Sequence, residues 1–95
     1  MNIKKKTMKN KEQTVPKWFK GTIYEDENVK VTNPFSGESY VLNGLELSMY
    51  DFIIGSQIVF ERRPGDATTK QVNEFHKALT WFRRNNPDAY FVLLD

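Results

Sequence analysis

Few side chains in the sequence could carry catalysis. His76 is the single histidine of the chain, and Thr80 follows it by four residues. A nucleophile needs a base within hydrogen-bond reach, and residues four apart on a helix meet mainly as an ordinary surface contact. His76 also borders an apolar stripe, where a boundary histidine is the simpler interpretation. We therefore expect no catalytic residue and a protein that is not an enzyme.

The sequence also lacks the patterns of metal and phosphate sites. There is no cysteine, which removes disulfides, thiolate metal ligands and thiol nucleophiles. Glu25, Asp26 and Glu27 are adjacent carboxylates without the ligand spacing of a calcium loop, so they favour a turn. The glycines are scattered singly, whereas a phosphate loop clusters them before a helix. We expect no metal and no cofactor.

Charge is distributed unevenly along the chain. Residues 1–20 carry seven lysines and one glutamate, whereas residues 21–95 carry seven lysines and arginines against eleven acidic residues. Residues 1–14 have no apolar periodicity, which predicts a disordered lysine-rich arm. A solubilising tail is the favoured interpretation. The alternative is a weak, salt-sensitive contact with nucleic acid through Lys4, Lys5, Lys6, Lys9 and Lys11.

The body of the protein does not resemble a dedicated nucleic-acid-binding domain, because its net charge is acidic. Its two arginine doublets, residues 62–63 and 83–84, should lie at opposite ends of an antiparallel helical hairpin. That arrangement predicts solvated charges rather than one anion-binding cluster.

Residues 43–60 form the most apolar stretch and predict the central helix. Asn43 is a good N-cap, and Glu46 lies where a capping-box carboxylate reaches back. Apolar residues fall on two nearly opposite faces, so the helix must be covered on both sides within its domain or by a partner. We favour internal burial. Gly55, on the polar seam, costs about 1 kcal/mol relative to alanine, which predicts close packing by the second helix or the hairpin, with a crossing partner chain as the alternative.

The remaining elements follow from strand alternation and turn residues. Residues 20–25, 29–33 and 39–42 predict a short antiparallel meander of about three strands, with Pro34 and Gly37 in the second turn. Asp66 or Thr68 should cap a second helix, whose apolar stripe ends at Phe82. Asn86 as a cap and Pro87 at the first helical position predict a short helix over residues 88–95, with a strand over 90–94 as the alternative. The fold class is α+β, in one domain over residues 15–95.

Five residues are candidates for a protein-binding surface. Trp18 should cap an edge of the core, and Phe35 lies in a turn where it either folds back or stays exposed. Asp51 lies on a polar seam of the central helix, and Tyr50 lies on one of its two apolar faces. Trp81 lies off the apolar stripe, so it either packs under the C-terminal segment or is displayed. The candidates are Trp18, Phe35, Tyr50, Asp51 and Trp81.

The stretches NPFSGESYVLNGLELSMYDFIIGSQ and ALTWFRRNNPDAYFVLLD resemble small uncharacterised proteins of large tailed phages, including those of marine cyanobacteria. The resemblance covers most of the chain beyond the arm and implies a setting rather than an activity. Such proteins commonly act by binding a host or phage protein.

We therefore expect a non-enzymatic, phage-type protein-binding module. Its partner would be a host or phage protein, and self-association through residues 45–60 is an alternative. No apolar run is long enough to span a membrane, and residues 1–11 lack the apolar region of a signal peptide. A cytoplasmic protein without membrane contact is expected.

Overall fold

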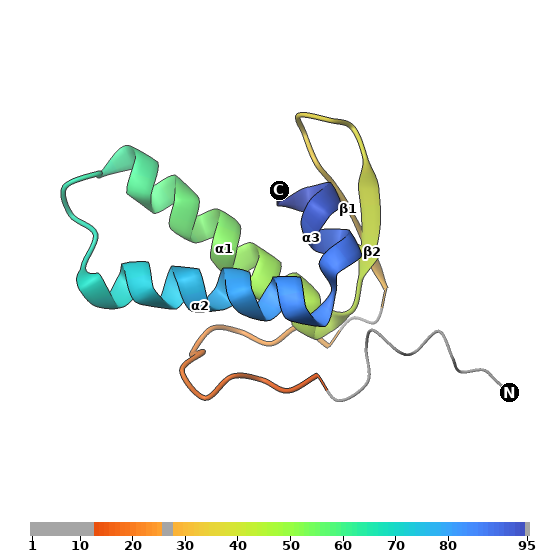
Figure 1. Cartoon of the computed structure of the whole chain (residues 1–95), viewed down its shortest axis with the longest axis horizontal. Helices are drawn as coiled ribbons and strands as arrows, with labels where there is room; N and C mark the ends of the chain where they lie inside the picture. Colours follow the sequence, from red (N-terminus) through yellow and green to blue (C-terminus); the bar gives the residue numbers. More distant parts are fainter. Residues whose placement is uncertain (1–12, 26–27, 95) are drawn as a thin grey trace, which may run out of the picture.

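The computed structural model describes residues 13–25 and 28–94. Two strands precede three helices in the described chain (Figure 1). Strands β1 and β2 pair antiparallel, helices α1 and α2 form a helical hairpin, and the short α3 packs against both α2 and β2. The α+β class is confirmed. The elements are β1 (Val29–Thr32), β2 (Ser39–Leu42), α1 (Gly44–Arg62), α2 (Thr69–Asn85) and α3 (Pro87–Leu93).

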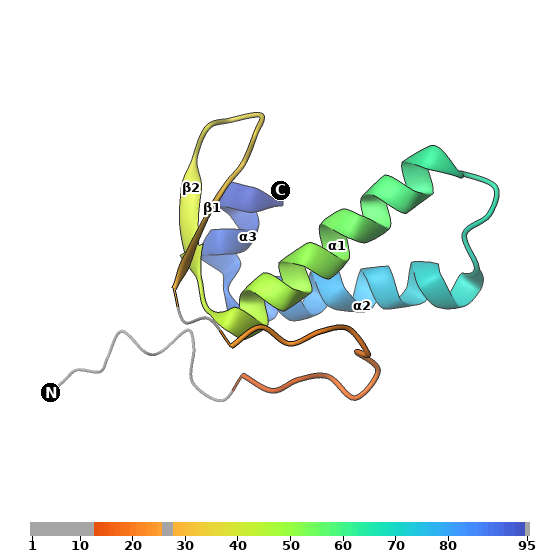
Figure 2. The same ribbon diagram turned by 180° about the vertical axis from the view of Figure 1, so that it is seen from behind.

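The predicted meander of about three strands is wrong by one strand, because residues 20–25 form no strand. They run along α1 instead (Figure 2). The backbone N–H of Tyr24 donates to Ser48 Oγ at 2.8 Å, and the Tyr24 hydroxyl donates to Asp51 Oδ2 at 2.7 Å. The backbone N–H and the hydroxyl of Tyr24 thus bond to helix α1 rather than to a neighbouring strand. Gly21 contributes to this course, because a Cβ there would lie 2.7 Å from the ring of Phe19.

The β1–β2 hairpin has the expected faces and turn. Val31 pairs with Tyr40 on the inner face, whereas Lys30 pairs with Val41 on the outer face. Gly37 adopts φ +80°, as the turn chemistry predicted. The Asn33 side chain accepts hydrogen bonds from the backbone of the turn, at 2.8 Å from the N–H of Phe35. The turn is therefore fixed by short-range contacts.

All three helices begin at the predicted caps. Asn43 and Glu46 form a complete capping box on α1. Thr68, rather than Asp66, caps α2 with Gln71 completing its capping box. Asn86 caps α3, with Pro87 as its first residue, so the C-terminal segment is a helix and not a strand. These starts were predictable because each depends on neighbouring residues alone.

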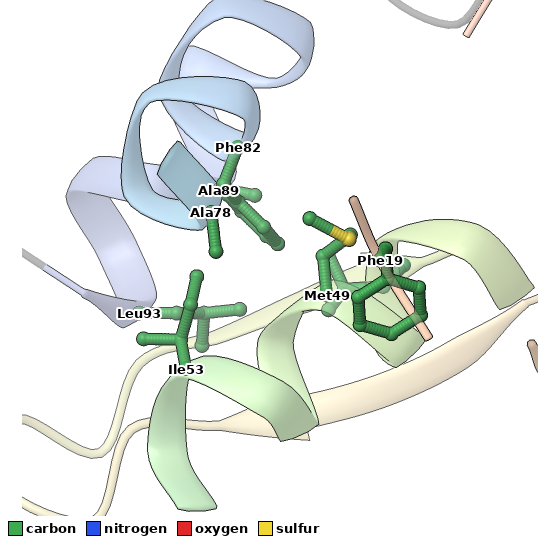
Figure 3. Close-up of a cluster of buried hydrophobic side chains, with 8 residues drawn as sticks. Phe19, Met49, Ile53, Ala78, Phe82, Ala89 and Leu93 are labelled. Carbon is green, nitrogen blue, oxygen red and sulfur yellow. The ribbon is translucent and has the colours of Figure 1, made fainter. Parts of the chain in front are cut away.

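The core lies where all the elements meet, and we call this part the base. It comprises residues 13–25, 28–53 and 78–94. Side chains from α1, α2 and α3 point toward one another there (Figure 3). The buried apolar residues of the described chain are Phe19, Leu42, Met49, Ile53, Ala78, Phe82, Ala89 and Leu93.

Residues 54–77, which we call the distal hairpin, contain no buried residue. They comprise the second half of α1, the connecting loop and the first half of α2, and the two helices diverge toward that loop (Figure 1). Phe60 and Phe75 make an edge-to-face contact across the hairpin, with ring centroids 5.4 Å apart. The expected internal burial of the central helix therefore holds only for its first half. Among the residues that the structure describes, no third element covers the outer faces of its second half.

Candidate functional site

Phe35 projects from the tip of the β1–β2 hairpin and is 97% exposed. Its exposure follows from how the turn is anchored. Asn33 Oδ1 accepts from the turn backbone, and Asn33 Nδ2 donates to the carbonyl oxygen of Val92 in α3 at 3.0 Å. Because the asparagine fastens the turn to α3, the aromatic ring is not needed for that contact. Of the two placements open for Phe35, the structure shows the exposed one.

Phe35 lies beside an apolar groove of about 540 Å³ between α1, α3 and the hairpin tip. We call it the Phe35 groove. Two isoleucines on the distal half of α1 form one wall, and the last leucines of the described chain form another. Tyr50 also lines this groove, so the structure brings two of the five candidates together. The apolar and aromatic lining comprises Phe35, Tyr50, Ile54, Ile58, Leu93 and Leu94.

Tyr50 and Asp51 are neighbours in sequence but lie on different surfaces. Tyr50 is half-buried, and its pKa is raised by burial first and by the nearby negative charge of Asp51 second. Asp51 is exposed and accepts the hydrogen bond from the Tyr24 hydroxyl. That hydrogen bond, followed by the charge of Asp51, raises the pKa of Tyr24. Asp51 therefore joins the 20–25 segment to α1 and lies away from the Phe35 groove.

A second groove, of about 470 Å³, lies between α1 and α2 and has Gly55 on its floor. We call it the Gly55 groove. A Cβ added to Gly55 would meet no atom within 4 Å outside its own helix. The expected close packing of the second helix or the β-hairpin against Gly55 is therefore wrong. The mid-helix glycine faces open space between Phe52 and Val59.

The two tryptophans lie where residues 13–25, the N-terminal segment, meet the helices. Trp18 packs against Phe19 and Phe52, with ring centroids 5.8 and 5.7 Å apart respectively. The indole N–H of Trp81 donates to the carbonyl oxygen of Thr14 at 3.1 Å. Trp81 is half-buried beneath the N-terminal segment, so neither of its two expected placements is the observed one. Trp18 and Trp81 line one groove, a proximity that their separation in the sequence concealed.

A buried polar cluster joins the N-terminal segment to the helices. Glu46 is 1% exposed, and its Oε1 accepts from the backbone N–H of Asn43 at 3.0 Å. Its Oε2 accepts from Gln13 Nε2 at 2.8 Å and from Asn86 Nδ2 at 3.1 Å. Three donors satisfy this carboxylate, which is what burial of a charged group requires. We assign Glu46 a structural role.

The N-terminal boundary lies earlier than the sequence indicated. Gln13 bonds to Glu46 and Asn43, and Thr14 accepts from Trp81, although both residues were assigned to the arm. They belong to the base. The candidate nucleic-acid contacts of the arm, which are Lys4, Lys5, Lys6, Lys9 and Lys11, lie outside the described residues.

Residues 13–25 and 28–94 hold neither a metal-binding group nor a helix that could span a membrane. No three histidine or acidic side chains there come together as a metal-binding group. None of the helices in this part combines the length and apolarity needed to cross a bilayer. None of the family models, curated proteins or solved structures compared with this chain matches it.

Proposed function

We propose that this protein is a non-enzymatic protein-binding module whose contact surface is Phe35 with the adjoining Phe35 groove. The observation that carries the proposal is the 97% exposure of Phe35 beside an apolar groove. An aromatic side chain buried in a partner contributes roughly 1.5–3 kcal/mol by removal from water. Aromatic anchors of this kind dominate many protein interfaces.

The groove provides the complementary half of such a contact. Ile58 on its α1 wall is 45% exposed, and Tyr50 on its floor is half-buried. A partner that covers Phe35 can therefore place an apolar side chain of its own against Ile54 and Ile58. Projection and groove lie side by side, so one partner surface can engage both.

The partner we propose is a host or phage protein in the cytoplasm, in keeping with the resemblance to small proteins of tailed phages. A second copy of the chain is the alternative. A projection next to a groove on one face is self-complementary under a two-fold axis, because each copy can insert its Phe35 into the groove of the other.

Site-specific photo-crosslinking tests the proposal directly. A photoreactive phenylalanine analogue replaces Phe35 in the full chain, and cells that produce the protein are irradiated. We expect one discrete adduct with a protein, and mass spectrometry of the adduct distinguishes a foreign partner from a second copy. The absence of any adduct would contradict the proposal.

The same analogue at Val41 is the matched control. Val41 is 48% exposed on the outer face of the same hairpin and does not line the Phe35 groove. No adduct is expected from this position. Equal labelling from both positions would show that the hairpin meets proteins without using the groove.

Phe35→Ser should then abolish the Phe35-dependent complex and leave the urea midpoint unchanged, since the ring has almost no contacts in the folded protein to lose.

A further inference from the structure

The Gly55 groove continues along α1 beyond the glycine. A smaller groove of about 230 Å³ lies between residues 19–24 and α1, and it shares Asp51 and Phe52 with the Gly55 groove. We call the two together the α1 groove. Its lining follows α1 from Ser48 to Phe60. At about 1.5 Å per residue this stretch is about 18 Å long, so the α1 groove fits a segment of chain better than a compact small molecule.

The lining of the α1 groove combines apolar and acidic side chains. Phe52, Val59 and Phe60 supply apolar surface, and Val59 is 47% exposed. Asp51 on α1 and Glu74 on α2 supply one carboxylate from each helix. Among the residues that the structure describes, no lysine or arginine lines either part of the groove. The surface is therefore both apolar and negatively charged.

Both carboxylates can meet a cation from a partner. Asp51 is exposed, and the neutral hydroxyl of Tyr24 that donates to it does not cancel its charge. Glu74 Oε2 lies 3.9 Å from Lys70 Nζ, and the lysine side chain is 80% exposed. A solvent-exposed pair at that distance contributes little, so a partner's cation can replace Lys70. An occupant that carries positive charges beside apolar side chains is thus complementary to the groove.

The walls of the Gly55 groove favour a helix as the occupant. Both walls are helices, whose backbone groups bond within themselves, so they offer no strand edge to an extended peptide. A helix satisfies its own backbone groups and needs only side-chain contacts. Gly55 also permits a close approach, because a Cβ there would meet no described atom within 4 Å outside its own helix.

We propose that the α1 groove binds a cationic amphipathic helix of a partner protein. The apolar face of that helix lies on Phe52, Val59 and Phe60, and it adds a third helix to the α1–α2 pair. Lysine or arginine side chains at the edges of this face pair with Asp51 and Glu74. The α1 groove shares no lining residue with the Phe35 groove, so the inference goes beyond the proposed function and does not depend on it.

A peptide library tests the proposal with the full chain. Random peptides of about 16 residues, long enough for a helix to span the groove, are displayed on yeast, selected on the wild type and counter-selected on Gly55→Gln. The added side chain blocks the floor of the groove, and an unchanged urea midpoint or a higher one verifies that the variant folds. We expect wild-type-specific peptides with apolar residues at i, i+3, i+4 and i+7 and a net positive charge. No wild-type-specific peptide, or enrichment of acidic peptides, would overturn the proposal.

A matched glycine variant locates the contact of a selected peptide. Gly55→Gln should lower its affinity about tenfold or more, because the new side chain clashes with the bound helix. Gly65→Gln adds the same side chain in the distal loop, where a Cβ also meets no described atom within 4 Å. It should leave the affinity unchanged. Equal effects of the two substitutions would contradict binding across Gly55.

The contribution of charge is measured with two double variants. Asp51→Asn with Glu74→Gln should lower the affinity about three- to tenfold and flatten its salt dependence. Glu38→Gln with Asp66→Asn removes the same charge from exposed positions that do not line the groove, and it should change the affinity less than about twofold. Equal losses from both pairs would assign the attraction to net charge and overturn the site.

Two other occupants of the α1 groove give different results in these experiments. A dimer in sedimentation of the wild type that Gly55→Gln abolishes would assign the groove to a second copy of the chain. Peptide binding that appears only after deletion of residues 1–12 would assign it to that lysine-rich stretch of the same chain. Either result would overturn the proposal of a partner helix.

Discussion

The base and the distal hairpin are built from the same two helices and yet differ in how those helices are covered. In the base, Met49 and Ile53 of α1 and Phe82 of α2 are fully buried. There α3, β2 and the N-terminal segment supply further sides of the core. In the distal hairpin no residue is buried, although apolar side chains lie on both sides of α1.

This difference shows what a helix with two apolar faces can mean. Two helices cover each other along one seam only, so a second apolar face needs a third element. Within residues 13–25 and 28–94, the base has that element and the distal hairpin does not. The apolar residues left over line the Phe35 groove on one side of α1 and the Gly55 groove on the other.

Truncation of one phenylalanine in each region should give the largest contrast. Phe82→Ala removes a fully buried ring from the base, and we expect a loss of about 3–5 kcal/mol in the free energy of unfolding. Phe60→Ala removes a half-buried ring whose main aromatic contact is Phe75, and a loss of about 1 kcal/mol is expected. Urea denaturation measures both. Equal losses would show that the two regions are packed alike.

The capping boxes allow a second matched test. Glu46 and Gln71 occupy the same position in α1 and α2, but Glu46 is buried and Gln71 is exposed. Glu46→Ala strands the donors of Asn43, Gln13 and Asn86, so we expect a loss of about 3 kcal/mol. Gln71→Ala should lower stability by less than about 1 kcal/mol, because water can replace its hydrogen bond. A small effect at Glu46 would mean that the buried cluster contributes little to the base.

The smallest expected change in the free energy of unfolding comes from the two tyrosines beside Asp51, at the junction of the base and the distal hairpin. Both tyrosines have a raised pKa in the folded protein, Tyr24 chiefly through its hydrogen bond to Asp51 and Tyr50 chiefly through burial. The unfolded chain therefore loses these protons first as pH rises above the ordinary tyrosine pKa. The free energy of unfolding is unaffected below that range and falls above it.

Ultraviolet absorbance of tyrosinate measures this titration. Asp51→Asn should shift it to lower pH, mainly through Tyr24, whereas Asp66→Asn in the distal loop should leave it unchanged. Superimposable curves for wild type and Asp51→Asn would show that the 20–25 segment is not held against α1 through Tyr24.

What the sequence could predict was largely local. The caps Asn43, Thr68 and Asn86 were identifiable because a cap acts on residues three positions away. The turn around Gly37 was identifiable for the same reason. The hydrogen bond between Glu46 and Asn86 was not identifiable, because it spans forty residues and both side chains already had a local role, Glu46 in the capping box of α1 and Asn86 as the cap of α3.

The two wrong predictions, for residues 20–25 and for Gly55, also arise because contacts distant in the sequence decide the outcome. Residues 20–25 alternate like a strand, but whether they pair with β1 or with α1 is decided by Ser48 and Asp51. Gly55 was expected to mark internal packing, since nothing in its neighbours reveals where α2 diverges.

The stability of Gly55→Ala tests the central claim most directly. If the Gly55 groove is open space in the folded chain, alanine adds helix propensity without a clash, and urea denaturation should show stabilisation by about 0.5–1 kcal/mol. Gly21→Ala is the counterpart in the base and should be destabilising, because its Cβ would press on the buried ring of Phe19. Destabilisation by Gly55→Ala would show that the chain itself fills the groove, and would contradict the account of an uncovered distal hairpin.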